Sequence, residues 1–269
     1  EELASRIPLP ETFKSTEEVE SALKIAEPRN RLDGATIAGR DFGDLSCSNA
    51  TFANCTFDNV RFDHGQFDLA AFENCTFVNC RFEHGSFVDA RFEGCKFFDS
   101  AARDGCSFRN CDFSRSTWNV CNFASVTFEQ CELQEVSAEE CNLRGAKFLK
   151  TNFFRGGGKR PITHTAQFNA CNFSYADMAS VQAGKCTFRG CQFVQTIMEE
   201  ANFADANLEG ATVTDCELRG ANFAGVNLTG GKLDGLLLSQ LSNFKNLKVS
   251  ASEQESLLSA LGVKVVWED

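Results

Sequence analysis

An apolar side chain, most often phenylalanine, returns every fifth residue through most of this chain of 269 residues. The first unbroken run consists of Leu32, Ile37, Phe42, Cys47, Phe52, Phe57, Phe62, Phe67, Phe72, Phe77, Phe82, Phe87, Phe92 and Phe97. A period of five fits neither an α-helix, at about 3.6 residues per turn, nor a flat strand, at two. The chain must therefore turn a corner in every unit, and this requirement decides the architecture of the whole fold.

Each unit also has a small residue two positions before its central apolar residue. Residues two apart on an extended segment point to the same side, so both are expected to be buried. A second period supports four faces per coil: Arg61–Cys80, RFDHGQFDLAAFENCTFVNC, closely matches Arg81–Ser100, RFEHGSFVDARFEGCKFFDS, twenty residues later. Like residues then stack on successive square coils. At about 4.8 Å per coil, about ten coils make a rod about 50 Å long.

The cysteines follow the same repeat. Thirteen of the fourteen, all but Cys47, stand two residues before a central position, where other units carry Ala50, Val60 or Gly65. Because cysteine alternates there with small residues, we expect buried free thiols in a reducing compartment. No CxxC pair with metal-binding spacing is present, and no metal site is expected.

The units CTFDN, ANFAD, ANLEG, CNLRG and ANFAG resemble the A(D/N)LXX unit of pentapeptide repeat proteins. The resemblance covers about residues 31–240. It implies an all-β solenoid, a right-handed quadrilateral β-helix of about ten coils, with short N- and C-terminal capping helices.

Three segments are therefore expected: an N-terminal capping segment at 1–30, the β-helix at 31–240 and a C-terminal module at 241–269. Ser15 and Glu18 have the spacing of a capping box before an amphipathic helix that should end near Pro28. Because the end of a β-helix exposes backbone and apolar rings, this helix is expected to cover the first coil. The side chains expected to do so are Val19, Leu23 and Ile25.

The C-terminal module is expected to cap the other end of the β-helix with a second helix. Residues 252–255 are expected to open a second short helix, Gly262 to end it, and residues 263–267 to form an apolar strand. This module is more apolar than one cap requires, so we expect it to dimerise across a two-fold axis, an elaborate monomeric cap being the alternative. The expected dimerisation residues are Leu257, Leu258, Leu261, Val263, Val265, Val266 and Trp267.

Two irregularities interrupt the repeat. The first is interpreted as one extra residue within Ala101–Cys106, assigned to Gly105. The second, residues 154–165, has three glycines and a proline and is expected to be a loop that projects from the rod. Loops on a rigid scaffold often carry function, although a tolerated insertion is the alternative. The predicted partner-binding residues are Arg155, Gly156, Gly157, Gly158, Lys159, Arg160, Pro161 and His164.

Composition and motifs exclude several classes of function. A solid rod has no concave site, and no catalytic motif is present, so neither an enzyme nor a cofactor is expected. His64 and His84, one coil apart, are interpreted as a surface ladder. The net charge of −11 argues against direct nucleic-acid binding. No apolar run approaches the roughly 20 residues of a membrane span, and no signal peptide is recognisable, so a cytoplasmic location is expected.

Three features are similar to the quinolone-resistance (Qnr-type) branch of pentapeptide repeat proteins, which also includes immunity proteins against topoisomerase poisons. They are the glycine break between two repeat blocks, the loop in the second block, and the Q-x-x-L-L-x-x-L-G-[IV]-x-V pattern from Gln254 to Val265. The chain departs from that branch in its greater length, its N-terminal helix and its loop sequence. The resemblance implies a homodimer that binds DNA gyrase or topoisomerase IV and relieves inhibition by such poisons.

An acidic rod of this kind has the charge sign of duplex DNA, so under this resemblance its carboxylates would mimic phosphates. The carboxylates expected to do so are Glu129, Glu132, Glu135, Glu139, Glu140, Glu199, Glu200, Asp205 and Glu209. The alternative is a solvated face that keeps the rod soluble. A bacterial interaction scaffold or effector with a non-topoisomerase partner is the second functional hypothesis, and a purely structural rod is the third.

Overall fold

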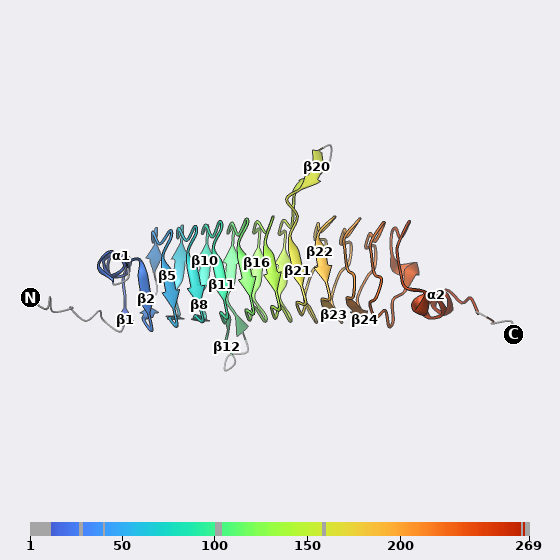
Figure 1. The fold of residues 1–269 in the computed structure, drawn as a ribbon, viewed down its shortest axis with the longest axis horizontal. Helices are drawn as coiled ribbons and strands as arrows, with labels where there is room; N and C mark the ends of the chain where they lie inside the picture. The colour runs from blue at the N-terminus through green and yellow to red at the C-terminus, as the bar shows by residue number, and fades with distance from the viewer. Residues whose placement is uncertain are drawn as a thin grey trace, which may run out of the picture.

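The protein is a straight rod of stacked coils with a short helix near each end (Figure 1). The structure, a computed structural model, describes residues 12–26, 29–39, 41–99, 104–157, 160–264 and 266. Successive coils pair in parallel, as when Phe62 lies beside Phe82. The column that begins at Ile37 passes through ten coils and ends at Leu233. The predicted quadrilateral solenoid is confirmed.

Each side of the square is a ladder of short parallel segments. The β4 face contains β4 (Phe42–Gly43), β7 (Arg61–Asp63), β10 (Arg81–Glu83), β14 (Ser107–Arg109), β16 (Thr127–Glu129) and β18 (Lys147–Leu149). The β2 face contains β2 (Arg31–Asp33), β5 (Thr51–Ala53), β8 (Ala71–Glu73), β11 (Arg91–Glu93), β15 (Thr117–Asn119), β17 (Ser137–Glu139), β21 (Gln167–Asn169) and β22 (Thr187–Arg189).

The β3 face contains β1 (Thr12–Phe13), β3 (Thr36–Ala38), β6 (Thr56–Asp58), β9 (Thr76–Val78), β23 (Gln192–Val194) and β24 (Thr212–Thr214). The fourth side, here the bridge face, is held by single bridges in a column from Ser46 to Asn243. Bridges also continue past residue 240 as far as Lys248.

The corners require a left-handed backbone at the second residue after each central one. Asn74 (φ 52°) and Asn79 (φ 50°) show why asparagine is frequent there, since it adopts this conformation at little cost. Three corner positions instead hold large apolar side chains that are exposed, namely Leu69, Val120 and Tyr175. Corner residues of successive coils can bond to one another, as Asn79 Nδ2 does by donating to Asn59 Oδ1 at 2.6 Å.

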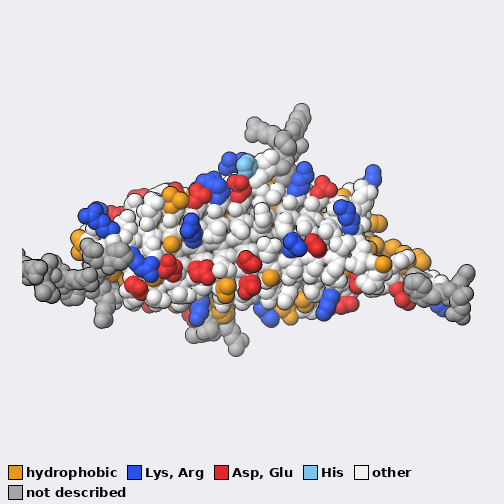
Figure 2. Space-filling view, viewed as in Figure 1, with side chains coloured by type: hydrophobic (Ala, Val, Ile, Leu, Met, Phe, Trp, Pro, Cys, Tyr) orange, Lys and Arg blue, Asp and Glu red, His pale blue; other side chains and the backbone are white. Residues whose placement is uncertain are grey.

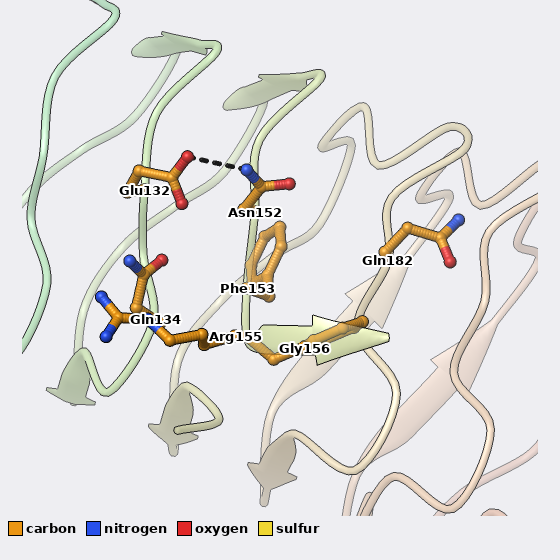
Figure 3. A pocket seen from close by; sticks show the side chains of 8 residues that line it. Glu132, Gln134, Asn152, Phe153, Arg155, Gly156 and Gln182 are labelled. Carbon is orange, nitrogen blue, oxygen red and sulfur yellow. Dashed lines mark hydrogen bonds between the residues drawn. The ribbon is translucent and has the colours of Figure 1, made fainter. Parts of the chain in front are cut away.

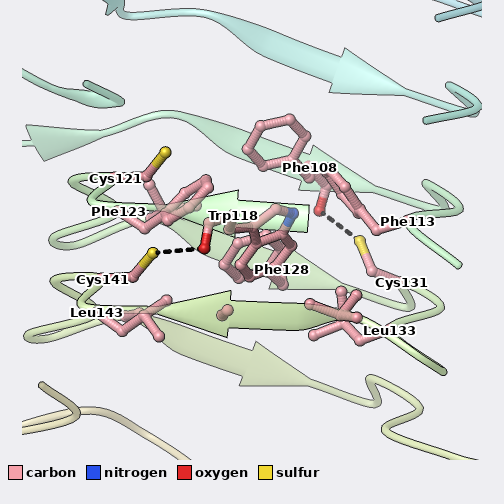
Figure 4. Close-up of a cluster of buried hydrophobic side chains, with 14 of the residues drawn as sticks. Phe108, Phe113, Trp118, Cys121, Phe123, Phe128, Cys131, Leu133, Cys141 and Leu143 are labelled. Carbon is pink, nitrogen blue, oxygen red and sulfur yellow. Dashed lines mark hydrogen bonds between the residues drawn. The ribbon is translucent and has the colours of Figure 1, made fainter. Parts of the chain in front are cut away.

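The interior contains columns of stacked aromatic rings, which aliphatic residues such as Leu133 and Leu143 interrupt. Phe77 lies with its ring centroid 4.5 Å from that of Phe57 and 4.3 Å from that of Phe97, with the planes nearly parallel. Rings on adjacent faces of the same coil meet edge to face, as Phe113 and Trp118 do at 5.5 Å (Figure 4). The absence of a polar tip on phenylalanine explains its repeated use, since the stack offers few buried partners for a hydroxyl.

The cysteines flank this stack as free thiols, as expected. Thirteen are buried and Cys216 is half-buried. Many of the thiols donate to the carbonyl of a central residue in the previous coil, such as Cys131 Sγ to Phe108 O at 3.5 Å (Figure 4). Burial raises the pKa of the Cys186 thiol to about 12, so this group stays protonated and unreactive at neutral pH.

The N-terminal cap combines a strand with a helix. β1 extends the β3 face by pairing Phe13 with Ile37, and α1 (Thr16–Ile25) follows. The predicted capping box is confirmed at its first bond, because Ser15 Oγ accepts from the Glu18 amide at 3.2 Å. The expected role of Ile25 was wrong. Its side chain is 63% exposed, because the buried side of the helix runs through Val19, Ala22 and Leu23.

Replacing Ser15 by alanine should lower the free energy of unfolding by about 1 kcal/mol, because the Glu18 amide loses its acceptor. Denaturant titration of both proteins measures the difference. Ser15→Asn is the matched control, since asparagine caps equally well and should leave stability unchanged. Equal loss in both variants would contradict a capping role.

The C-terminal cap differs from the expected one in two respects. A single turn, η1 (Leu238–Gln240), lies within the last stretch of the rod, and a second one, η2 (Ala251–Glu253), and α2 (Gln254–Ala260) follow its last bridge at Lys248. Ser252 lies inside η2, so the helix expected to open at residues 252–255 begins with this single turn, and α2 starts at Gln254. Gly262 ends the helix at φ 77°, as predicted. The chain after α2 is irregular at Val263, Lys264 and Val266, so the apolar strand expected there was wrong at these residues. Residues 265 and 267 lie outside the described residues.

The first irregularity is an insertion of six residues and not of one. β10 pairs with β14 at an offset of 26 residues, from Arg81 to Ser107, where a regular coil has 20, as between β7 and β10. The additional chain leaves the rod through β12 (Phe98–Asp99) and returns through β13 (Asp104–Gly105), antiparallel to it. Gly105 is required by the close approach of this segment, since an added Cβ would lie 2.5 Å from the backbone of Ser125.

Candidate functional site

The most prominent surface feature is a hairpin that projects from one corner of the rod (Figure 1). Its strands are β19 (Arg155–Gly157) and β20 (Arg160–Thr163), which pair antiparallel. It is an insertion of ten residues, because Ser137 pairs with Gln167 at an offset of 30. The Ala166 amide donates to Phe153 O at 2.9 Å and closes the corner beneath it. The predicted projecting loop is confirmed.

The predicted partner-binding residues are spread along this hairpin. Arg155 and Gly156 are exposed where β19 leaves the rod. Gly157, Arg160 and Pro161 contribute backbone to its strands, whereas residues 158 and 159 lie outside the described residues. His164 lies at the foot of the hairpin, with Nδ1 2.9 Å from Glu135 Oε1.

The corner below the hairpin carries charges of alternating sign. Arg115 binds Asp89 of the previous coil through two hydrogen bonds of 2.9 and 2.8 Å. These bonds lower the pKa of the Asp89 carboxyl. Glu135 stands in the next coil and pairs with His164. The hairpin therefore rises from a corner whose own charges are already paired.

A hollow of about 440 Å³ lies beside the foot of the hairpin on the bridge face. It is lined by Glu132, Gln134, Asn152, Phe153, Phe154, Arg155, Gly156 and Gln182 (Figure 3). Asn152 Nδ2 donates to Glu132 Oε1 at 2.8 Å. Gln134 is only 6% exposed, and its Oε1 is the one buried side-chain oxygen of the described residues without a hydrogen-bond partner. A partner group that donates a hydrogen bond would find an acceptor here.

The nine expected mimic carboxylates do not form one face. Glu129, Glu199 and Glu200 follow the β4 side, and Glu139, Glu140 and Glu209 follow the β2 side. Glu132 lies on the bridge face, and Glu135 and Asp205 on its corner with the β2 face.

Several of these carboxylates have basic partners one coil away. The ion pairs Glu129–Arg109, Glu199–Arg219 and Glu209–Arg189 have N–O distances of 2.9, 2.8 and 3.4 Å. Acidic and basic side chains are interspersed over the visible surface (Figure 2). The negative potential of the rod therefore comes from its net charge and not from one continuous acidic surface.

The expected dimerisation residues divide into two groups. Leu257 is 6% exposed and packs in the core, so it caps its own rod. Leu261, Val263 and Val266 are exposed, whereas Val265 and Trp267 lie outside the described residues. Leu258 is half-buried.

Sequence reasoning missed two apolar residues at this end, Leu237 and Phe244, which are also exposed. Hydrophobic side chains gather at this end in the space-filling view (Figure 2). The sequence signal for Phe244 was its spacing. It stands 21 residues after Phe223, one more than in a regular coil, and Asn222 bridges Asn243 at the same offset.

No helix of the described residues is long and apolar enough to cross a membrane.

Comparison with known proteins agrees with this geometry. Two family models match, one for a pentapeptide repeat region over residues 162–238 and one for eight copies of the pentapeptide repeat over residues 121–155. No curated protein sequence matches the chain.

Solved structures similar in fold include three of QnrB1, a plasmid-mediated fluoroquinolone resistance protein. The full-length form is 24% identical, with a TM-score of 0.71 over 77% of this chain and 97% of that one. Two trypsin-treated variants are 23% and 21% identical, with TM-scores of 0.72 and 0.70 over 79% and 85% of this chain and 99% and 100% of theirs. Residues 121–155 and 162–238 thus match the pentapeptide repeat, and the fold of the rod resembles that of QnrB1.

Proposed function

We propose that this rod binds a type II topoisomerase, DNA gyrase or topoisomerase IV, and protects it from topoisomerase poisons without catalysing a reaction. The observation that carries the proposal is the likeness in fold to nearly the whole length of QnrB1, a fluoroquinolone resistance protein. The net charge of −11 and the projecting hairpin support the same role.

The charge density of the rod limits how closely it can mimic duplex DNA. Residues 31–240 carry 26 acidic and 19 basic side chains, and this net charge of −7 over ten coils spaced about 4.8 Å apart gives about one charge per 7 Å of rod. Duplex DNA carries one per about 1.7 Å. Charge alone would therefore give weaker attraction than DNA, so the hairpin and the adjoining hollow are expected to supply the remaining affinity and the specificity.

A gyrase supercoiling assay tests the proposal. Purified gyrase is challenged with a fluoroquinolone and, separately, with a gyrase-poisoning natural product, while this protein is titrated in. Supercoiling should recover at protein concentrations that leave unpoisoned gyrase active. The assay is repeated with topoisomerase IV and decatenation. Failure to recover activity of either enzyme with any poison would overturn the proposal.

The exposed apolar residues at the C-terminal end are proposed to bind a second copy of the chain. Wild-type protein should then sediment as a dimer, and the double substitution Leu261→Asp and Val263→Asp should give a monomer, because buried carboxylates without partners oppose association. Sedimentation velocity at several concentrations measures this. Leu69→Asp, at an exposed apolar position on another coil, should remain dimeric. A wild-type monomer at all concentrations would contradict the proposal.

An interaction scaffold with a non-topoisomerase partner is the second candidate. It is favoured by the ion pairs between coils, which neutralise part of the expected mimic surface. Such a scaffold would bind its partner with little dependence on salt, whereas a phosphate mimic would weaken strongly as salt is raised.

A further inference from the structure

A second polar cluster lies outside the hairpin, on the corner between the β4 face and the bridge face. Asp63 is the last residue of β7, and His64 follows it. His84 follows β10 in the equivalent position of the next coil. The two imidazole rings stack with centroids 4.8 Å apart and planes 16° from parallel. The ladder expected from the sequence is present, and Asp63 joins it.

The three side chains each offer one possible ligand atom, and the two imidazole nitrogens both lie close to the Asp63 carboxylate. His64 Nδ1 lies 3.0 Å from Asp63 Oδ1, and His84 Nδ1 lies 3.2 Å from the same oxygen. The three ligand atoms all lie within 4.8 Å of one another. Metal–ligand bonds of about 2.0–2.1 Å separate neighbouring ligand atoms by about 2.9–3.4 Å in octahedral or tetrahedral geometry. Both N–O distances fall in that interval.

The residues around Asp63, His64 and His84 are compatible with a bound metal ion. The Asp63 carboxylate is partly exposed, so an ion from solution can reach it. The other nearby carboxylate, that of Glu83, is engaged by Arg61 at 3.3 Å. Asn110 Nδ2 lies 3.3 Å from His84 Nε2, and its amide can turn to accept from that nitrogen when Nδ1 holds a metal.

We propose that Asp63, His64 and His84 bind a divalent transition-metal ion on this corner, with Zn²⁺ as the probe. Two neutral imidazoles and one carboxylate are a donor set that suits Zn²⁺ and its neighbours better than Mg²⁺ or Ca²⁺. The side chains are partly exposed, so water completes the coordination. His164 offers a contrast within the chain, since it pairs with Glu135 but has no second imidazole beside it.

Isothermal titration of Zn²⁺ into chelator-treated full-length protein tests the site. One ion should bind per chain. Both His64→Asn and His84→Asn should weaken binding at least about tenfold, since loss of an outer-shell partner alone can cost that much. Asparagine suits the test because it adopts the positive φ that these corners require, as Asn110 does in the same column. His164→Asn is the matched control and should bind Zn²⁺ as the wild type does.

Two spectroscopic readouts identify the ligands. With three histidines in the chain, ¹⁵N imidazole resonances should shift for His64 and His84 on adding Zn²⁺ and stay in place for His164. Co²⁺ in place of Zn²⁺ should give no thiolate charge-transfer band. The proposal is overturned by absence of saturable binding, by equal loss in the His164→Asn control, or by a Co²⁺–thiolate band, which would assign the metal to the cysteines.

Discussion

Deletion of residues 156–165 should strongly weaken protection of the topoisomerase and leave the rod folded. The deletion removes ten residues, the length of the insertion, so Arg155 joins directly to Ala166 and the 20-residue offset between coils is restored. Arg155 then occupies a corner like that of Arg115, which adopts φ 59°. Because the charge density of the rod is below that of DNA, loss of the hairpin should raise the concentration for half-maximal protection at least about tenfold, or about 1.4 kcal/mol.

Two controls accompany this deletion. Far-UV circular dichroism and the thermal midpoint should match those of the wild type, which separates loss of contact from loss of fold. A second variant keeps the hairpin length but replaces residues 156–162 with glycine and serine, and it should also lose protection if the side chains matter. Retained protection by the folded deletion variant would remove the hairpin from the proposed binding surface.

The regular part of the fold could be predicted from sequence because the five-residue period fixes which side chains are buried. The match between Arg61–Cys80 and Arg81–Ser100 placed Phe62 beside Phe82, and their rings stack at 4.8 Å. It also placed His64 beside His84. The third member of that cluster, Asp63, was not foreseen, because a count of residues gives the coil and face of a side chain but not its direction.

The length of the first insertion could not be deduced from the period. Six additional residues equal one repeat unit of five plus one residue. The six-residue insertion therefore looked like a single extra residue beside one further unit. That reading rotates every later residue by one face. Relative positions after the insertion are unaffected, since Glu129 and Glu139 are two units apart and so lie on different sides of the rod in either reading.

Truncation of one ring inside the stack should have the largest effect on stability. Phe87 is buried, with its ring 5.0 Å from that of Phe67 and 4.8 Å from that of Phe113 in the neighbouring coils. Phe87→Ala should lower the free energy of unfolding by about 3–5 kcal/mol. The upper part of this range is expected, because backbone hydrogen bonds hold the adjacent coils at a fixed spacing and the cavity cannot collapse.

Denaturant unfolding followed by circular dichroism measures the loss, with Phe87→Leu and Leu69→Ala as graded controls. Phe87→Leu keeps most of the apolar volume and should cost much less than alanine. Leu69 is 56% exposed on a corner, so Leu69→Ala should change stability by less than about 0.5 kcal/mol. Since each coil contacts only its neighbours, a cavity at Phe87 also weakens both adjoining interfaces and should broaden the transition. Equal stability of Phe87→Ala and Leu69→Ala would contradict a rod held together by its stacked rings.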